Sequence, residues 1–242
     1  GAANGKLGKA FTLGFKVRYY DYDNGSSRIE FPGYVRFNGV WEDIGRVTVP
    51  YSYTVQDLGA DLGWNFGEAS RLGLAFNRQS WDRTFREVKD SDEDVIKLTY
   101  DTRFGDLQLR AAYEWGDRSI GDYRTEAMEA TFIEPEGITN LPALRKYDEA
   151  ARTYDGYYVQ AWWYASEKLD FAFGVNQRSD DYDESRFGLV SDEVLQYNAE
   201  VNFAIAEGTN LYAFYQRSER EVFQRSRQSG ATPSTNPLDD WD

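Results

Sequence analysis

Runs of acidic side chains are the first residues in this sequence whose types and spacing could do chemistry. One run contains Asp180, Asp181, Asp183 and Glu184, and others lie near residues 21–24 and 90–94. Calcium takes about six to eight oxygen ligands from a flexible loop. None of the runs has the glycine and terminal glutamate of an EF-hand at the required spacing. We therefore expect solvated acidic loops and predict no metal site, with Asp180, Asp181, Asp183 and Glu184 as the candidates for calcium.

Histidine and cysteine are both absent from the 242 residues. This chain therefore cannot form Cys/His zinc sites, Ser-His-Asp triads, Cys nucleophiles or disulfides. It also cannot attach a c-type haem, which needs Cys-x-x-Cys-His, so any redox centre must belong to a partner. Paired carboxylates of the glycosidase type could be assembled from so many acids, but no spacing singles out a pair. We expect no catalytic residues and no enzymatic activity.

Composition narrows the class further. The formal net charge is −14, which argues against nucleic acid as a partner because phosphate binding needs basic patches. No run of about 18 apolar residues occurs, so no transmembrane helix is predicted. Alternating barrel strands would still be compatible with this low hydropathy. The first ten residues lack the apolar core of a signal peptide, so we expect a mature chain or a piece of a longer one.

The clearest pattern is the alternation of apolar and polar residues. In DLQLRAAYEWGDR, Leu107, Leu109 and Trp115 alternate with polar neighbours such as Arg110 and Glu114. Such a period of two predicts a strand with one apolar and one wet face. Nine segments of this kind lie near residues 10–22, 51–64, 70–81, 94–104, 107–118, 155–165, 168–179, 193–206 and 210–222.

The connections between these segments alternate between short and long. Long loops are expected at 23–50, 119–154 and 223–242, with tight turns between the other ends. Transmembrane barrels sort their loops in this way, whereas a soluble sandwich has no reason to do so. Each clear segment runs about 10 to 13 residues, against about 5 to 6 in soluble sheets. The sequence therefore predicts an all-β, antiparallel, up-and-down transmembrane barrel, with residues 1–242 as one barrel segment.

Two further expectations concern the ends of the strands. Aromatic residues near segment ends predict girdles at the lipid–water boundary; they are Tyr19, Tyr20, Tyr22, Tyr51, Tyr53, Trp64, Phe66, Trp81, Tyr113 and Trp115. The segment 141–154 has helical character and could form a short helix in the longest loop. Because single-chain bacterial barrels close with an even number of strands, nine strands suggest part of a larger barrel.

The wet face is expected to line the lumen. Its charged members are Lys16, Arg18, Asp57, Asp61, Arg71, Lys97, Asp101, Arg110, Glu114, Asp170 and Glu200. Charges of both signs indicate a lumen that is hydrated or filled by a polar partner. Many glycines and alanines share this face, either because another backbone approaches closely or because glycine eases curvature. Both interpretations remain open.

Several stretches resemble the MtrB/PioB family of decahaem-associated outer-membrane β-barrels. They are VRYYDYDNGSSRIEFPGYVRF (17–37), ITNLPALRKYDEA (138–150) and RQSGATPSTNPLDDW (227–241). The resemblance covers most of the chain and corresponds to an internal portion of a longer family barrel. Some family members carry a Cys-x-x-Cys near the N-terminus, which this sequence lacks.

The resemblance implies a porin-like sheath in the outer membrane of a Gram-negative bacterium. A periplasmic multihaem c-type cytochrome would sit in the lumen and carry electrons across the membrane, and the long loops could meet an extracellular cytochrome. Haem is then expected on the partner and no cofactor on this chain. One alternative is a general solute or oligosaccharide porin. Another is a soluble β-rich carbohydrate-binding domain that uses exposed aromatic residues as sugar platforms.

Overall fold

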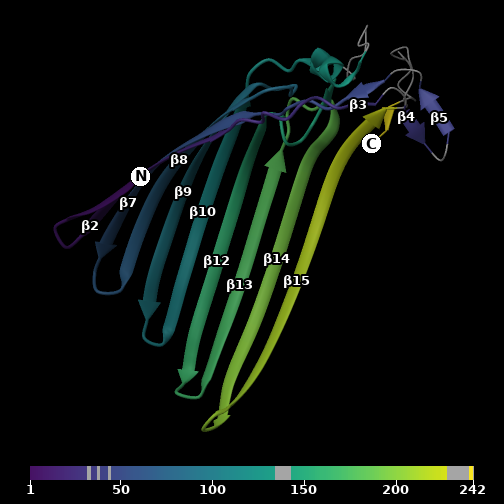
Figure 1. The fold of residues 1–242 in the computed structure, drawn as a ribbon. Coiled ribbons are helices and arrows are strands. Elements are labelled where there is room, and N and C mark those ends of the chain that lie inside the picture. Colours follow the sequence, from purple (N-terminus) through teal and green to yellow (C-terminus); the bar gives the residue numbers. More distant parts are fainter. Residues whose placement is uncertain (32–33, 37–38, 43–44, 134–142, 228–239, 242) are drawn as a thin grey trace.

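The computed structural model describes residues 1–31, 34–36, 39–42, 45–133, 143–227 and 240–241, and it consists mainly of one curved antiparallel sheet (Figure 1). The sheet order is β1-β2-β7-β8-β9-β10-β12-β13-β14-β15-β16, so consecutive long strands lie side by side. Its long strands are β2 (Phe11–Tyr22), β7 (Tyr53–Phe66), β8 (Ser70–Arg83), β9 (Asp90–Phe104), β10 (Leu107–Ile120), β12 (Arg152–Ser166), β13 (Leu169–Asp181), β14 (Phe187–Ala206) and β15 (Thr209–Arg227).

These nine strands confirm the nine predicted segments, and several extend further than predicted. Strand β14 begins six residues earlier than the alternation suggested and reaches 20 residues, and β15 has 19. A strand was missed at the N-terminus, where β1 (Ala2–Leu7) pairs with β2. Its sequence, AANGKL, contains little apolar alternation, so its partner rather than its own pattern specifies the strand.

The two ends of the sheet differ in their connections, as predicted. Tight turns join the strands at one end, and Gly67, Gly105 and Gly208 have φ of 66°, 57° and 77° there. Glycine adopts this left-handed conformation without steric cost. The long connections all lie at the opposite end, which we call the loop end (Figure 1).

Short elements occupy the long connections. They are β3 (Glu30–Phe31) paired with β6 (Arg46–Val47), β4 (Tyr34–Arg36) paired with β5 (Gly39–Glu42), the 3-10 helix η1 (Thr125–Thr131), β11 (Leu144–Arg145) and β16 (Asp240–Trp241). The helix predicted over 141–154 is wrong for the described part of that range, where β11, turns and the start of β12 lie instead. Residues 141 and 142 of that prediction, and 228–239 of the last predicted loop, lie outside the described residues.

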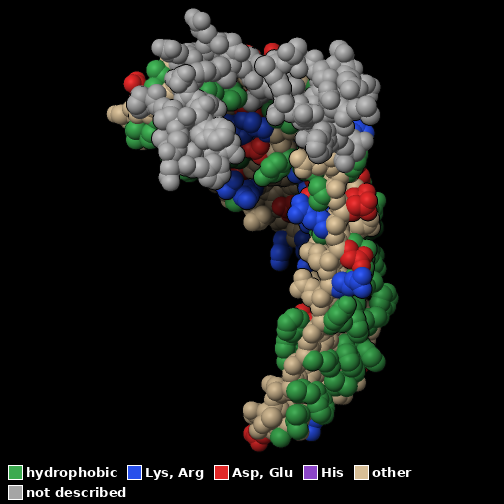
Figure 2. Space-filling view, turned by 90° about the vertical axis from the view of Figure 1, so that its right-hand side faces the viewer, with side chains coloured by type: hydrophobic (Ala, Val, Ile, Leu, Met, Phe, Trp, Pro, Cys, Tyr) green, Lys and Arg blue, Asp and Glu red, His purple; other side chains and the backbone are tan. Residues whose placement is uncertain are grey.

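Most large hydrophobic side chains of the long strands are exposed rather than packed into a core. Leu74, Leu98 and Phe173 are each more than 40% exposed, as are many others on the same face. Figure 2 shows hydrophobic side chains over the lower part of the convex side of the sheet and Lys and Arg side chains along its concave side. An apolar surface of this extent requires a nonaqueous neighbour. The strand pattern therefore leaves one face of the sheet apolar and unpacked within the described residues.

The buried hydrophobic residues are concentrated at the loop end instead. Val47, Val88, Phe132, Tyr182 and Phe187 are all less than 10% exposed. They come from the loops and from the strand ends beside them, so a small core forms where loops pack on one another. Among the described residues, no helix is both long and apolar enough to cross a membrane.

Candidate functional site: the concave face of the sheet

The charged residues predicted for the wet face all lie on one face of the sheet, which we call the concave face. The register aligns Arg71, Asp101 and Arg110 on three neighbouring strands, and Lys97 with Glu114 on two of them. Lys16, Arg18, Asp57 and Asp61 share that face through the β2–β7 register. The opposite face, which carries Leu74 and Leu98, is called the convex face. The assignment of one of these faces to a lumen is part of the function proposed below.

Cross-strand ion pairs organise the concave face. Arg18 on β2 pairs with Asp57 on β7, whose other oxygen accepts a 2.7 Å hydrogen bond from Gln79 Nε2 on β8. Arg110 Nε donates a 2.6 Å hydrogen bond to Asp101 Oδ1. Opposite charges directly across a ladder stabilise the pairing of strands. These contacts fix the position of each cationic side chain on the concave face.

A second cluster centres on Glu114. Its Oε2 lies 3.0 Å from Lys97 Nζ, and its Oε1 accepts a 2.8 Å hydrogen bond from the Tyr154 hydroxyl. The Tyr154 ring lies across Gly116, where any Cβ would collide with it. The glycine therefore makes room for a neighbouring ring, a reason that neither sequence interpretation of the small residues included. Gly73 differs, because its nearest side-chain or backbone atom would be 3.8 Å from a Cβ.

Asp180 has two arginine partners beside this cluster. Arg178 donates two hydrogen bonds to it, at 2.7 and 2.8 Å, and Arg152 Nη1 lies 3.3 Å away. Alternation along the chain places Asp181 on the convex face, so the two acids diverge. Among the described residues, no group of three or more Asp or Glu side chains could hold a metal ion. The described structure therefore does not gather Asp180, Asp181, Asp183 and Glu184 into one group, and calcium binding there stays a prediction.

The remaining predicted acids lie toward the turn end of the concave face. Asp170 Oδ2 accepts a 3.5 Å contact from Asn202 Nδ2, and Glu200 is aligned with Ala172. Neither contacts the ion pairs around Glu114 within the described residues. The structure thus brings Lys97, Asp101, Arg110 and Glu114 together and leaves these two apart.

The predicted aromatic girdle is only partly right. Tyr113 and Trp115 share the convex face with the apolar residues, and Trp64 stacks there on Phe11 with ring centroids 6.3 Å apart. The register places another group on the concave face near the loop end, so the girdle assignment for it is wrong. That group is Tyr20, Tyr22, Tyr53 and Trp81. The ring centroid of Tyr53 lies 5.3 Å from the ring centroids of both Tyr22 and Trp81. Alternation from Arg18 and Asp57 could have revealed this.

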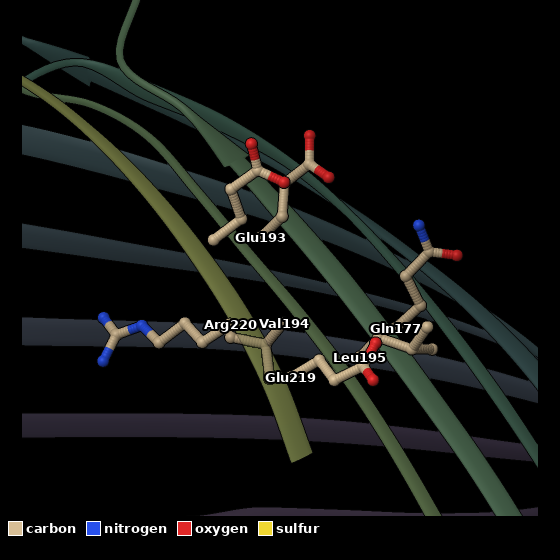
Figure 3. Close-up of a pocket in the computed structure, with 7 residues that line it drawn as sticks. Gln177, Glu193, Val194, Leu195, Glu219 and Arg220 are labelled. Carbon is tan, nitrogen blue, oxygen red and sulfur yellow. The ribbon is translucent and has the colours of Figure 1, made fainter.

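The convex face also carries charge, above its apolar part. A shallow hollow of about 300 Å³ lies over β13, β14 and β15, lined by Gln177, Glu193 and Glu219 among others. Figure 3 shows Arg220 pointing to the opposite side from Gln177. Arg220 forms an ion pair with Asp192 on the concave face. Consecutive residues of β15 thus point to opposite faces of the sheet.

Loops cover part of the concave face at the loop end, and we call this layer the roof (residues 84–89, 121–133 and 143–151). Its buried anchor is Glu149, which is 1% exposed, pairs with Arg86 and accepts a 3.1 Å hydrogen bond from the Val88 amide. Arg118, from the concave face of β10, donates to the carbonyl oxygens of Tyr147 and Ala150 at 2.6 and 2.8 Å. The roof is therefore tied to the strands beneath it.

Sequence reasoning missed this anchor, since Arg86 and Glu149 lie 63 residues apart. One tyrosine of the roof also changes its acidity. Burial is the main cause that raises the pKa of the Tyr123 phenol above its ordinary value of 10.0. The Tyr123 hydroxyl accepts a 3.2 Å hydrogen bond from the Lys146 amide, and the Arg145 guanidinium lies 4.3 Å from its ring centroid.

Comparisons with known proteins agree with this architecture. The family model described as "Putative outer membrane beta-barrel porin, MtrB/PioB" matches residues 2–242. Outer membrane protein MtrB of Shewanella baltica (strain OS185) is 23% identical over 232 residues, which are 95% of this chain and 32% of that protein. The chain thus spans about a third of the length of this curated relative.

Two solved outer-membrane proteins are similar in structure. In vitro folded OmpT of Vibrio cholerae, in its trimer form, gives a TM-score of 0.44 at 10% identity, covering 91% of this chain and 80% of that one. A Pseudomonas aeruginosa FadL homologue gives 0.45 at 12% identity, covering 96% and 60%. The family match extends over nearly the whole chain. The sheet of that chain has an apolar convex face and a charged concave face. This chain belongs to the MtrB/PioB family of outer-membrane β-barrel proteins.

Proposed function

We propose that this chain forms part of the wall of an outer-membrane barrel that sheathes a multihaem c-type cytochrome for electron transfer across the membrane. The observation that carries the proposal is a continuous charged concave wall behind an apolar convex wall. Ion pairs on the concave wall run from Arg18 on β2 to Arg220 on β15. A wall of this kind suits a polar occupant on one side and lipid on the other.

The width of the sheet supports a large occupant. An eight-stranded barrel leaves an interior just wide enough for its own side chains, and larger barrels enclose channels. Here nine long strands lie side by side, and in the described residues β1 pairs with β2 but not with β15. Such a sheet fits the wall of a lumen wider than its own side chains would fill.

The division of labour follows from chemistry. Without cysteine or histidine, this chain cannot attach a c-type haem, so the haems belong to the occupant. The chain itself supplies an apolar barrier toward lipid and a polar surface toward the guest, and no catalytic group. The resemblance of its loop phrases to decahaem-associated barrels, and its relative's name, point in the same direction.

The test is to purify the full-length protein from outer membranes in mild detergent and measure haem absorbance against barrel protein. We expect haem to co-elute with the barrel, and a barrel from a strain without the cytochrome to be stable but haem-free. Barrel protein that never contains haem and conducts ions as an open pore would instead favour the solute porin. The soluble carbohydrate-binding alternative is wrong for a member of an outer-membrane family.

A further inference from the structure

Four ion pairs on the concave face share one asymmetry, in which the cation is more exposed than the carboxylate, whereas the pair of Arg152 with Glu93 does not, at 17% and 21%. The Arg18 side chain is 59% exposed and its partner Asp57 only 8%. The same holds for Arg110 and Asp101, at 56% and 33%. Each pair therefore places its carboxylate near the sheet and its cationic tip toward the space in front of it.

Two more pairs of the concave face also have a cation that is more exposed than its carboxylate. Lys97 is 43% exposed against 16% for Glu114. Arg220 is 61% exposed against 16% for Asp192. At these four pairs the concave face therefore presents the cation rather than the carboxylate, although the charges of each pair cancel.

Pairs on the convex face lack this asymmetry. Arg78 and Asp92 are 44% and 41% exposed, and Arg217 and Glu219 are 59% and 47% exposed. The cationic tips are also opposite in sign to the whole chain, whose formal net charge is −14. The arrangement is thus a property of one face rather than a by-product of composition.

Cations without a carboxylate partner strengthen this surface. Arg71 donates a 3.1 Å hydrogen bond to Thr12 Oγ1, and in the described residues it has no ion pair. It borders a hollow of about 310 Å³ that is also lined by Lys97, Arg110 and Gly73, and by the acids Asp61 and Asp101. Arg110 hydrogen-bonds to Asp101 through its Nε, and its side chain remains 56% exposed. Three cations therefore line this hollow together with the small residues Gly73 and Ala75.

We propose that the concave face is a docking surface for an acidic protein, whose surface carboxylates contact the tips of Arg71, Lys97 and Arg110. This rests on the proposed function, because it states the charge of the occupant that the barrel sheathes. The shielded carboxylates Asp101 and Glu114 hold the cation stems in place and do not contact the occupant. Complementary charge of this kind orients a partner and suppresses wrong ones, and it weakens as salt screens it.

The experiment uses the full-length barrel with its occupant and the triple variant Arg71→Gln, Lys97→Gln, Arg110→Gln. Its matched control is Arg78→Gln, Lys89→Gln, Arg217→Gln, which removes three paired cations that are not on the concave face. Barrels are immobilised and washed with rising NaCl while released haem is measured. We expect the concave triple to release half its haem at a salt concentration at least about twofold lower than wild type, with the control unchanged. Equal release by both triples would overturn the proposal.

A second arm separates this idea from the proposed function. If no haem co-purifies, the sheath proposal fails, and the empty barrel is reconstituted in a planar bilayer and exposed to poly-glutamate or poly-lysine. Block by poly-glutamate alone, weakened several-fold in the concave triple, would support the acidic-partner surface. Block by poly-lysine, or equal block by both polymers, would overturn it. Heat-dependent migration on gels verifies that each variant has folded.

Discussion

The ring of Tyr154 on β12 lies across Gly116 on β10, and its hydroxyl donates a 2.8 Å hydrogen bond to Glu114 Oε1. The Arg178 guanidinium lies 3.6 Å from the centroid of the same ring. One side chain thus joins three neighbouring strands on the concave face. The glycine is required because any Cβ at position 116 would enter the space that the ring occupies.

Substitution of this glycine is the first prediction. Gly116→Ala should displace Tyr154 and lower the free energy of unfolding by about 1–3 kcal/mol, as overpacking does. The measurement is urea unfolding of the full-length barrel in lipid vesicles, followed by gel mobility. Gly73→Ala is the matched control, since its Cβ would meet nothing nearer than 3.8 Å. Equal unfolding midpoints for the two variants would contradict the packing argument.

The roof anchor gives a second prediction. Glu149→Gln removes the buried charge that pairs with Arg86 and accepts the Val88 amide, and weakening these charged hydrogen bonds should cost about 1–3 kcal/mol, because Arg86 keeps its pair with Asp148. We expect the loop between β10 and β12 to become sensitive to trypsin in intact vesicles. Asp148→Asn tests the exposed partner of the same arginine and should cost at most about 1 kcal/mol. A loop that stays resistant in Glu149→Gln would refute the anchor.

Adjacent residues on β8 test which face meets lipid. Leu74→Lys places a charge on the convex face and should destabilise the barrel by about 2–4 kcal/mol if the site lies near the bilayer midplane. Ala75→Lys, one residue later, places the same charge in the concave hollow and should have a much smaller effect. Unfolding in vesicles measures both. A reversed order would mean that the two faces are assigned the wrong way round.

Alkaline pH should loosen the roof through Tyr123. Burial raises the pKa of this phenol in the folded state, so its contribution to stability is complete below the ordinary pKa of 10.0. As the pH rises above 10.0 and through the higher folded-state pKa, that contribution is lost, because the unfolded state ionises first. Trypsin digestion of the loop across this pH range measures the change. Tyr123→Phe should lack this pH-dependent step, and a step that persists in the variant would assign it to another group.

The sequence by itself determined the strands and their two faces, because side chains alternate with a period of two in any extended segment. The alternation of Leu107, Leu109 and Trp115 with Arg110 and Glu114 is a local property of the chain. It identified every long strand, the loop end and the turn end. It missed β1, whose residues carry almost no apolar pattern of their own.

Only the tertiary structure decided which residues meet across strands. Arg18 meets Asp57, 39 residues away, and Arg86 meets Glu149, 63 residues away. Such contacts depend on register and on how loops pack, and neither is encoded by a local period. The same reason explains why Tyr53 and Trp81, predicted for a lipid girdle, lie on the concave face. It also explains why the cation is more exposed than its carboxylate in four pairs of the concave face, because that difference arises only when neighbouring strands lie side by side.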